Sequence, residues 1–321
     1  IFIPIIFSVL VGFVIIGMTR LLAKVPGVGP RLSIQMRYIV SALVMAVGLV
    51  SVAWLLFANV GRAVALAPQY QDSLLASIQN LAVTLGLEAE PSWKSLRQQF
   101  IAQVSIQRLV GGVLGSVLSI VATLIVVFLY VAFLLVEQRS FSAKIQNISE
   151  DPGQVAFIRQ IITNVNGKIG TYLALKTLLS VMLGVFTWVI MAFFGMEFAV
   201  FWGVLIALLN YVPYIGSFLS IFLPAVFAIL QFGNLNAVLA VMVPLSIVQF
   251  ANGNFLDPYL MGNSLNLSPF VILVSLTVWS ALWGIPGAFL AVPMTAVMVM
   301  IFAEFPGTRP FAVLLSRKGD V

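Results

Sequence analysis

The stretch "IGTYLALKTLLSVMLGVFTWVIMAFFG" at 169–195 decides the fold class, because Lys176 is its only charged side chain. About 20 predominantly apolar residues suffice for a helix to span a bilayer. Further stretches of spanning length, at 1–19, 38–60 and 109–136, carry no charge at all. The sequence therefore predicts an all-α polytopic membrane protein.

Composition supports this class and excludes several chemistries. The chain is 61% hydrophobic and 8% charged, whereas soluble domains carry about 25% charged residues. Its net charge of +6 is explained by membrane topology and not by a nucleic-acid partner. Without cysteine or histidine there is no thiol nucleophile, Cys/His zinc site or histidine base, so no metal or cofactor is predicted. Because the sequence opens on Ile1 without a basic leader, we interpret its start as a truncation and not a signal peptide.

Charge clusters predict the orientation. Basic residues gather at 20–37, 139–168 and 309–318, which by the positive-inside rule places these segments and the C-terminus in the cytoplasm. The expected order is N-terminal transmembrane helices at 1–60, an extracytoplasmic amphipathic helical segment at 61–108, a transmembrane helix at 109–136, a cytoplasmic amphipathic segment at 137–168, a transport region at 169–305 and a cytoplasmic tail at 306–321. Asp151 followed by Pro152 predicts a helix start that runs into the span after it.

Two similar interruptions divide the apolar runs of the second half. They are "NYVPYIGSFLSIFLPAV" (210–226), with Pro213 and Gly216, and "LWGIPGAFLAVPMTAV" (282–297), with Pro286 and Gly287. Paired Gly/Pro breaks point to the substrate region of transporters, although Pro and Gly are also common in ordinary membrane helices. Arms of about 15 residues span only about 22 Å, which favours re-entrant hairpins over separate short crossings.

Polar residues concentrate near these breaks. Neutral amides and hydroxyls suit a sugar-like cargo, because they donate and accept hydrogen bonds without needing a counter-charge. The candidate binding residues are Asn210, Tyr211, Tyr214, Gln249, Asn252, Asn254, Asp257 and Lys176. We expect the chain to leave regular structure after Gln249 and form a polar gate with Asp257 as its titratable group. The alternative is an ordinary cytoplasmic loop in which Asn-Gly and Asp-Pro are turn residues.

Other residues have weaker signals. Lys176 shares a helix face with Tyr172 and Ser180, and either functions at membrane depth or extends to the headgroups. Gly111, Gly115 and Ser119 recur every four residues, which predicts a helix-packing or oligomer seam. The glutamates at 137, 197 and 304 end or separate apolar runs, and we place them at interfaces with solvent.

Several segments together resemble one family of membrane proteins. "LNYVPYIGS" (209–217), "GNFLDPYLMG" (253–262), "PGAFLAVPMT" (286–295) and "AVLLS" (312–316) are similar to signature segments of the autoinducer-2 exporter family. The resemblance implies export of autoinducer-2, a small polyhydroxylated quorum-sensing signal, from the bacterial inner membrane. It also implies a homo-oligomer, with a pentamer as the best expectation, and some relatives resemble sodium/proton antiporters.

The sequence thus predicts a transporter that exports a small polar metabolite, autoinducer-2 or a similar compound. A GxxxxGK[ST] motif is absent from the sequence, so transport is expected to be passive or coupled to H⁺ or Na⁺ and not driven by ATP. The first alternative is a sodium/proton antiporter in which Asp257 or Lys176 carries the proton. The second is a membrane scaffold or channel. An enzyme is not predicted, because no nucleophile–base pair is evident.

Overall fold

The computed structural model describes residues 2–27, 29–55, 58–59, 62, 123, 125–137, 140–141, 143–261 and 265–319. Within these residues, six helices are long and apolar enough to cross a membrane: Ile3–Lys24, Ile34–Leu55, Pro152–Phe193, Ile215–Phe232, Leu235–Met261 and Ile285–Glu304. This confirms the predicted all-α polytopic membrane class. The amphipathic helices predicted within 61–108 lie outside the described residues.

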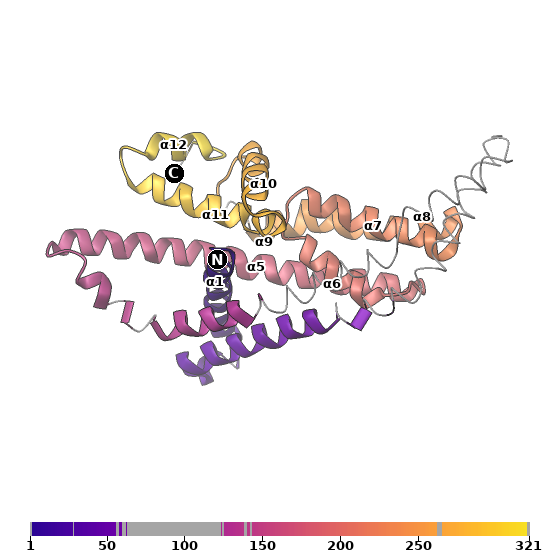
Figure 1. Cartoon of the computed structure of the whole chain (residues 1–321), viewed down its shortest axis with the longest axis horizontal. Helices are drawn as coiled ribbons and strands as arrows, with labels where there is room; N and C mark the ends of the chain where they lie inside the picture. The colour runs from indigo at the N-terminus through magenta and orange to yellow at the C-terminus, as the bar shows by residue number, and fades with distance from the viewer. Residues whose placement is uncertain are drawn as a thin grey trace. The chain divides into compact units, whose positions relative to one another are not determined.

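Helix α5, Pro152–Phe193, joins the predicted cytoplasmic amphipathic segment to the span after it (Figure 1). It starts where the sequence predicts, because the backbone N–H of Gly153 donates to Asp151 Oδ1 at 2.8 Å and caps the first turn. At 1.5 Å per residue the helix is about 63 Å long, about twice the roughly 30 Å of a bilayer core. Part of α5 therefore extends beyond the membrane.

The chain forms two compact units, and α5 contributes to both. The first contains α1 (Phe2–Lys24), the 3-10 turn Gly29–Arg31, most of the helix Ile34–Leu55, the helix Ile125–Glu137, the first part of α5, and the C-terminal helices. These last are α9 (Asp257–Met261), α10 (Pro269–Trp283), α11 (Ile285–Glu304) and α12 (Arg309–Leu315). Its main core packs Ile169 and Leu173 of α5 against Val292 and Ala296 of α11.

The chain after α12 returns to the segment that precedes α10. The N–H of Ser268 donates to the carbonyl of Leu315 at 3.1 Å, and the N–H of Arg317 donates to the carbonyl of Asn266 at 2.9 Å. Leu267 and Ser316 thereby form an isolated antiparallel bridge. The first part of the predicted tail is therefore ordered against the protein.

The second unit contains the C-terminal part of α5, α6 (Ala199–Leu209), α7 (Ile215–Phe232), α8 (Leu235–Ala251) and most of the π-helical segment Asn252–Leu256. Leu183 and Met191 of α5 are buried in its core with Ile206 of α6 and Val241 of α8. Gln231 fixes the loop after α5, because its amide donates to the Gly195 carbonyl at 2.9 Å and its oxygen accepts from the Glu197 N–H at 2.8 Å.

Both predicted helix breaks are present, one in each unit. Helices α6 and α7 are joined through Tyr214, at φ 60°, and α10 and α11 through Gly284, at φ 64°. In both turns the second helix starts very close to the end of the first. At the α6–α7 turn, a Cβ on Gly216 would lie 1.9 Å from the Leu209 carbonyl oxygen. A Cβ on Gly287 would lie 1.8 Å from the Trp279 oxygen. The glycines are therefore steric requirements of the two turns.

Close helix packing also depends on glycine. A Cβ on Gly17 of α1 would lie 2.3 Å from the carbonyl oxygen of Gly170 on α5, and one on Gly184 of α5 would lie 2.6 Å from that of Gly203 on α6. Small residues allow backbones to approach this closely in membranes. The predicted seam of Gly111, Gly115 and Ser119 lies outside the described residues.

The α1–α5 contact can be tested with two alanine substitutions on the same helix. Gly17→Ala should lower the melting temperature of the purified protein, since its methyl group meets backbone and costs about 1–3 kcal/mol. Gly12→Ala is the matched control: among the described residues, no atom outside its own stretch of helix lies within 4 Å of its Cβ position, and alanine gains up to about 1 kcal/mol of helix propensity. Equal melting temperatures for the two variants would contradict the close approach.

The α10–α11 turn permits a similar test. Gly287→Ala should destabilise the protein by at least 2 kcal/mol, roughly the upper part of the overpacking range, because the Trp279 carbonyl cannot move without distorting α10. Gly307→Ala, with open space at its Cβ position, should change little. Thermal unfolding in detergent measures the stability of both variants. A Gly287→Ala protein as stable as wild type would show that the turn tolerates a side chain.

Candidate functional site

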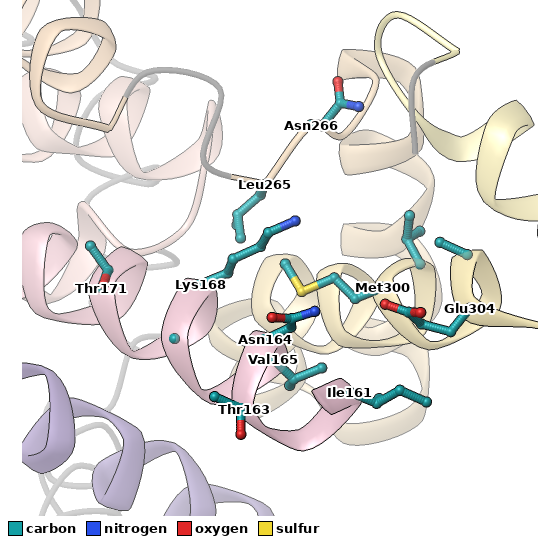
Figure 2. Close-up of a pocket in the computed structure, with 13 residues that line it drawn as sticks. Ile161, Thr163, Asn164, Val165, Lys168, Thr171, Leu265, Asn266, Met300 and Glu304 are labelled. Atoms are coloured by element: carbon teal, nitrogen blue, oxygen red, sulfur yellow. The ribbon is translucent and has the colours of Figure 1, made fainter. Parts of the chain in front are cut away.

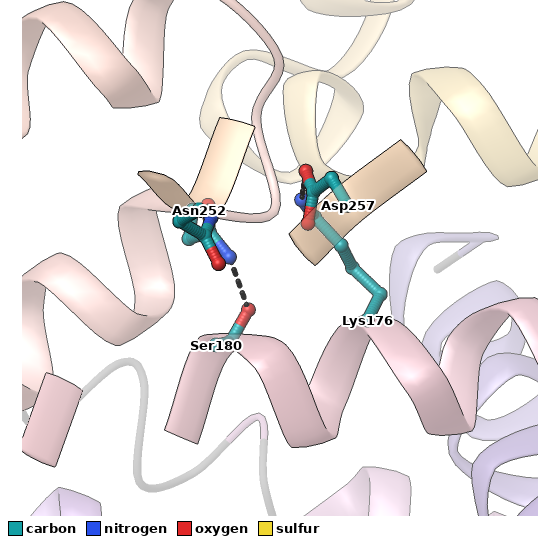
Figure 3. Close-up of polar contacts among 5 residues, drawn as sticks. Lys176, Ser180, Asn252 and Asp257 are labelled. Carbon is teal, nitrogen blue, oxygen red and sulfur yellow. Dashed lines mark hydrogen bonds and ion pairs between the residues drawn. The ribbon is translucent and has the colours of Figure 1, made fainter. Parts of the chain in front are cut away.

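A partly buried ion pair joins α5 to α9 in the first unit. Lys176 Nζ lies 3.0 Å from Asp257 Oδ2, and the two side chains are 8% and 27% exposed (Figure 3). The second oxygen of Asp257, Oδ1, is buried without a hydrogen-bond partner among the described residues. Lys176 therefore points into the protein and does not extend to the headgroups.

The helix beyond Gln249 corrects one prediction. The sequence predicts that the chain leaves regular structure there, but α8 passes through the π-helical segment Asn252–Leu256 into α9. A π-helical turn accommodates one extra residue without ending the helix, and such turns are frequent at functional sites. Pro258 is tolerated because it occupies the first turn of α9, where a missing N–H costs little. Asn252 and Asp257 are thus held on helical backbone.

A chain of neutral polar side chains lies inside the second unit. Asn210 Nδ2 donates to Ser180 Oγ at 3.0 Å, and Asn252 Nδ2 lies 3.4 Å from Asn210 Oδ1. The residues are 1%, 5% and 2% exposed for Ser180, Asn210 and Asn252. They come from α5, the end of α6 and the π-helical segment. We call these three residues the amide–hydroxyl network.

The other predicted binding residues are placed differently. Gln249 is 7% exposed, and its Nε2 has no hydrogen-bond partner among the described residues. Asn254 is exposed and donates to the Phe250 carbonyl of its own helix at 3.0 Å. Tyr214 is 52% exposed at the start of α7, and Tyr211 is partly buried. The structure thus joins Asn210 and Asn252 directly and leaves Asn254 and Tyr214 at the surface.

The break residues have distinct structural roles. Pro213 lies in the turn between α6 and α7, and Gly216 lies in the first turn of α7 against the Leu209 carbonyl. Pro286 occupies the first turn of α11 beside Gly287. The sequence missed Ser180 as a hydrogen-bonding member, although it lies on the Lys176 face of α5.

Among the described residues no group of three or more His, Cys, Asp or Glu is placed to hold a metal ion.

The ion pair leads to a stability prediction. Asp257→Asn should destabilise the protein by about 3–5 kcal/mol, because it leaves the buried Lys176 ammonium without a counter-charge. Lys176→Met should cost less, since Asp257 is more exposed, and the double variant should cost less than the sum of the two. Lys144→Met removes one partner of the exposed Lys144–Glu137 pair and should change stability by less than about 1 kcal/mol. Additive effects of the two single substitutions in thermal unfolding would exclude a direct coupling.

Comparison with known proteins identifies the family of the chain. The family model described as AI-2E family transporter matches residues 1–307. The chain is 30% identical over 250 residues to the AI-2 transport protein TqsA of Escherichia coli K12, covering 78% of this chain and 71% of TqsA. It is 30% identical over 280 residues to YhhT of the same strain, covering 85% and 77% of the two chains.

A further relative comes from Borreliella burgdorferi. It is 34% identical over 202 residues, and the match spans 63% of this chain but only 56% of the relative. This protein and YhhT are named provisionally as transport proteins. With a family match over nearly the whole chain and a polytopic helical fold, the chain belongs to the AI-2E family of transporters.

Proposed function

We propose that this protein exports a small polar metabolite, autoinducer-2 or a similar compound, across a bacterial inner membrane. The observation that carries the proposal is the amide–hydroxyl network, which buries neutral donors and acceptors among apolar helices. Such groups bind a polyhydroxylated solute by exchanging hydrogen bonds without separating charge. The name of TqsA, an AI-2 transport protein, supports this cargo.

The proposed transport region is 169–305, with the amide–hydroxyl network as its cargo-binding part. Gln249 is a further candidate contact, because its buried amide nitrogen has no partner among the described residues. The helix breaks at Pro213/Gly216 and Pro286/Gly287 are proposed hinges, as expected of discontinuous transporter helices. The basic clusters and the C-terminus would face the cytoplasm, and the protein would act as a homo-oligomer, with a pentamer expected from the family.

The ion pair favours a second candidate function, sodium/proton antiport. Asp257 Oδ1 is buried without a partner among the described residues, while Oδ2 contacts Lys176. A carboxylate in this position can exchange a lysine contact for a proton or a sodium ion. Asp257 would then alternate between Lys176 and the bound cation. The neutral amide–hydroxyl network has no charged group that could act as such a switch.

Purified protein in liposomes distinguishes the functions. We expect autoinducer-2 flux along its gradient in wild type, measured by reporter assay of the external medium. Sodium-driven pH change without flux would support the antiporter, and the absence of both would support a scaffold. Flux that requires a sodium or proton gradient would show coupled export.

Substitutions in the network sharpen the test. Asn252→Leu and Asn210→Leu remove buried amides at similar volume, and each should lower flux at least tenfold, since a lost hydrogen bond to substrate is worth about 1.5 kcal/mol. Asn254→Leu is the matched control, because this amide is exposed and donates to the Phe250 carbonyl of its own helix. Wild-type flux in a folded Asn252→Leu protein would remove the network from cargo binding.

A further inference from the structure

A cavity of about 790 Å³ lies between α5, α11 and the segment before α10, all within the first unit (Figure 2). Lys168, Asn164 and Thr171 of α5 line one wall, and Glu304 and Met300 of α11 line another. Leu265 and Asn266 close the third side, and the hydrogen bond from the Arg317 N–H to the Asn266 carbonyl holds that segment in place. The volume is in the range of small-molecule sites.

The cavity lies at the polar ends of the apolar stretches of two membrane-spanning helices, α5 and α11. Lys168 directly precedes the apolar part of α5, and Glu304 is the last residue of α11. The neighbouring residues Ile169 and Val299 are already buried in the core of this unit. Charges at such positions mark the level of the lipid headgroups, so the cavity opens at the membrane interface.

The two charges on the cavity walls have opposite signs. Neither Lys168 nor Glu304 forms an ion pair or side-chain hydrogen bond with the residues that the structure describes. A purely basic pocket between helices suits anionic headgroups, but Glu304 would repel a second negative charge. A ligand that carries both a negative and a positive group satisfies both walls.

The lining also distinguishes between kinds of cation. Quaternary ammonium groups are typically bound by aromatic cages, and none of the described lining residues is aromatic. A primary ammonium instead donates hydrogen bonds directly to a carboxylate such as Glu304. Lys168, with the amide of Asn164 and the hydroxyl of Thr171, supplies donors for a phosphate.

We propose that this cavity binds a phosphoethanolamine group, with its phosphate at Lys168 and its ammonium at Glu304. The apolar wall of Met300, Val299 and Leu265 is suited to the glycerol and first acyl carbons of a phospholipid that carries this group. The same chemistry is present in soluble phosphoethanolamine, and the two sources differ in whether the apolar wall contributes.

The test uses delipidated, purified protein and native mass spectrometry with phosphatidylethanolamine, phosphatidylcholine and phosphatidylglycerol of matched chains. We expect phosphatidylethanolamine to bind at least tenfold more tightly than either of the others. Soluble phosphoethanolamine is titrated in parallel by thermal shift. If phosphatidylethanolamine binds more tightly than soluble phosphoethanolamine, the natural ligand is the lipid. If the two bind with equal affinity, the natural ligand is the soluble compound.

Variants assign the charges. Lys168→Met should lower affinity for all phosphate-bearing ligands tenfold or more, whereas Glu304→Gln should abolish the preference for ethanolamine over choline and retain phosphate binding. Arg159→Met, on α5 but outside the cavity, and Glu150→Gln are the controls and should leave binding unchanged. Equal binding of the three lipids by wild type, or an unaltered preference in a folded Glu304→Gln protein, would overturn the proposal.

Discussion

The absence of water from a bilayer core is the constraint on which this structure depends, because a polar group buried there without a partner within the protein costs free energy. The Lys176–Asp257 pair and the amide–hydroxyl network are two solutions to it. The first compensates opposite charges, and the second links neutral donors and acceptors. Burying such groups costs stability relative to apolar side chains of similar size, which favours a functional reason for keeping them.

Helix α5 links these features to the rest of the chain. Within about three turns it presents Lys168 to the interfacial cavity, Lys176 to the ion pair and Ser180 to the network. It also approaches α1 at Gly170 and α6 at Gly184, so closely that a side chain in place of either facing glycine would meet backbone. Packing and polar chemistry therefore constrain the same helix.

Local signals were sufficient to predict much of the fold. Asp151 before Pro152 located the start of α5, and Pro213/Gly216 and Pro286/Gly287 located the two turns. The predicted exit after Gln249 was wrong, because the contacts of Asn252 with Asn210 and of Asp257 with Lys176 outweigh a helix-propensity deficit of up to about 1 kcal/mol per residue. The partnership of Lys176 with Asp257 joins residues 81 positions apart, and no local pattern encodes it. The cavity was missed for a related reason, since Glu304 alone is indistinguishable from an ordinary interfacial charge.

The central claim is that buried neutral groups bind the cargo, independently of cation exchange. Equilibrium binding of autoinducer-2 to the purified wild-type protein, measured at constant pH with sodium and with choline as the only monovalent cation, tests it most directly. The account predicts saturable binding of equal affinity in both salts, with no uptake or release of protons. Binding that requires sodium, or that exchanges a proton for the ligand, would contradict it and assign the Lys176–Asp257 pair the leading role.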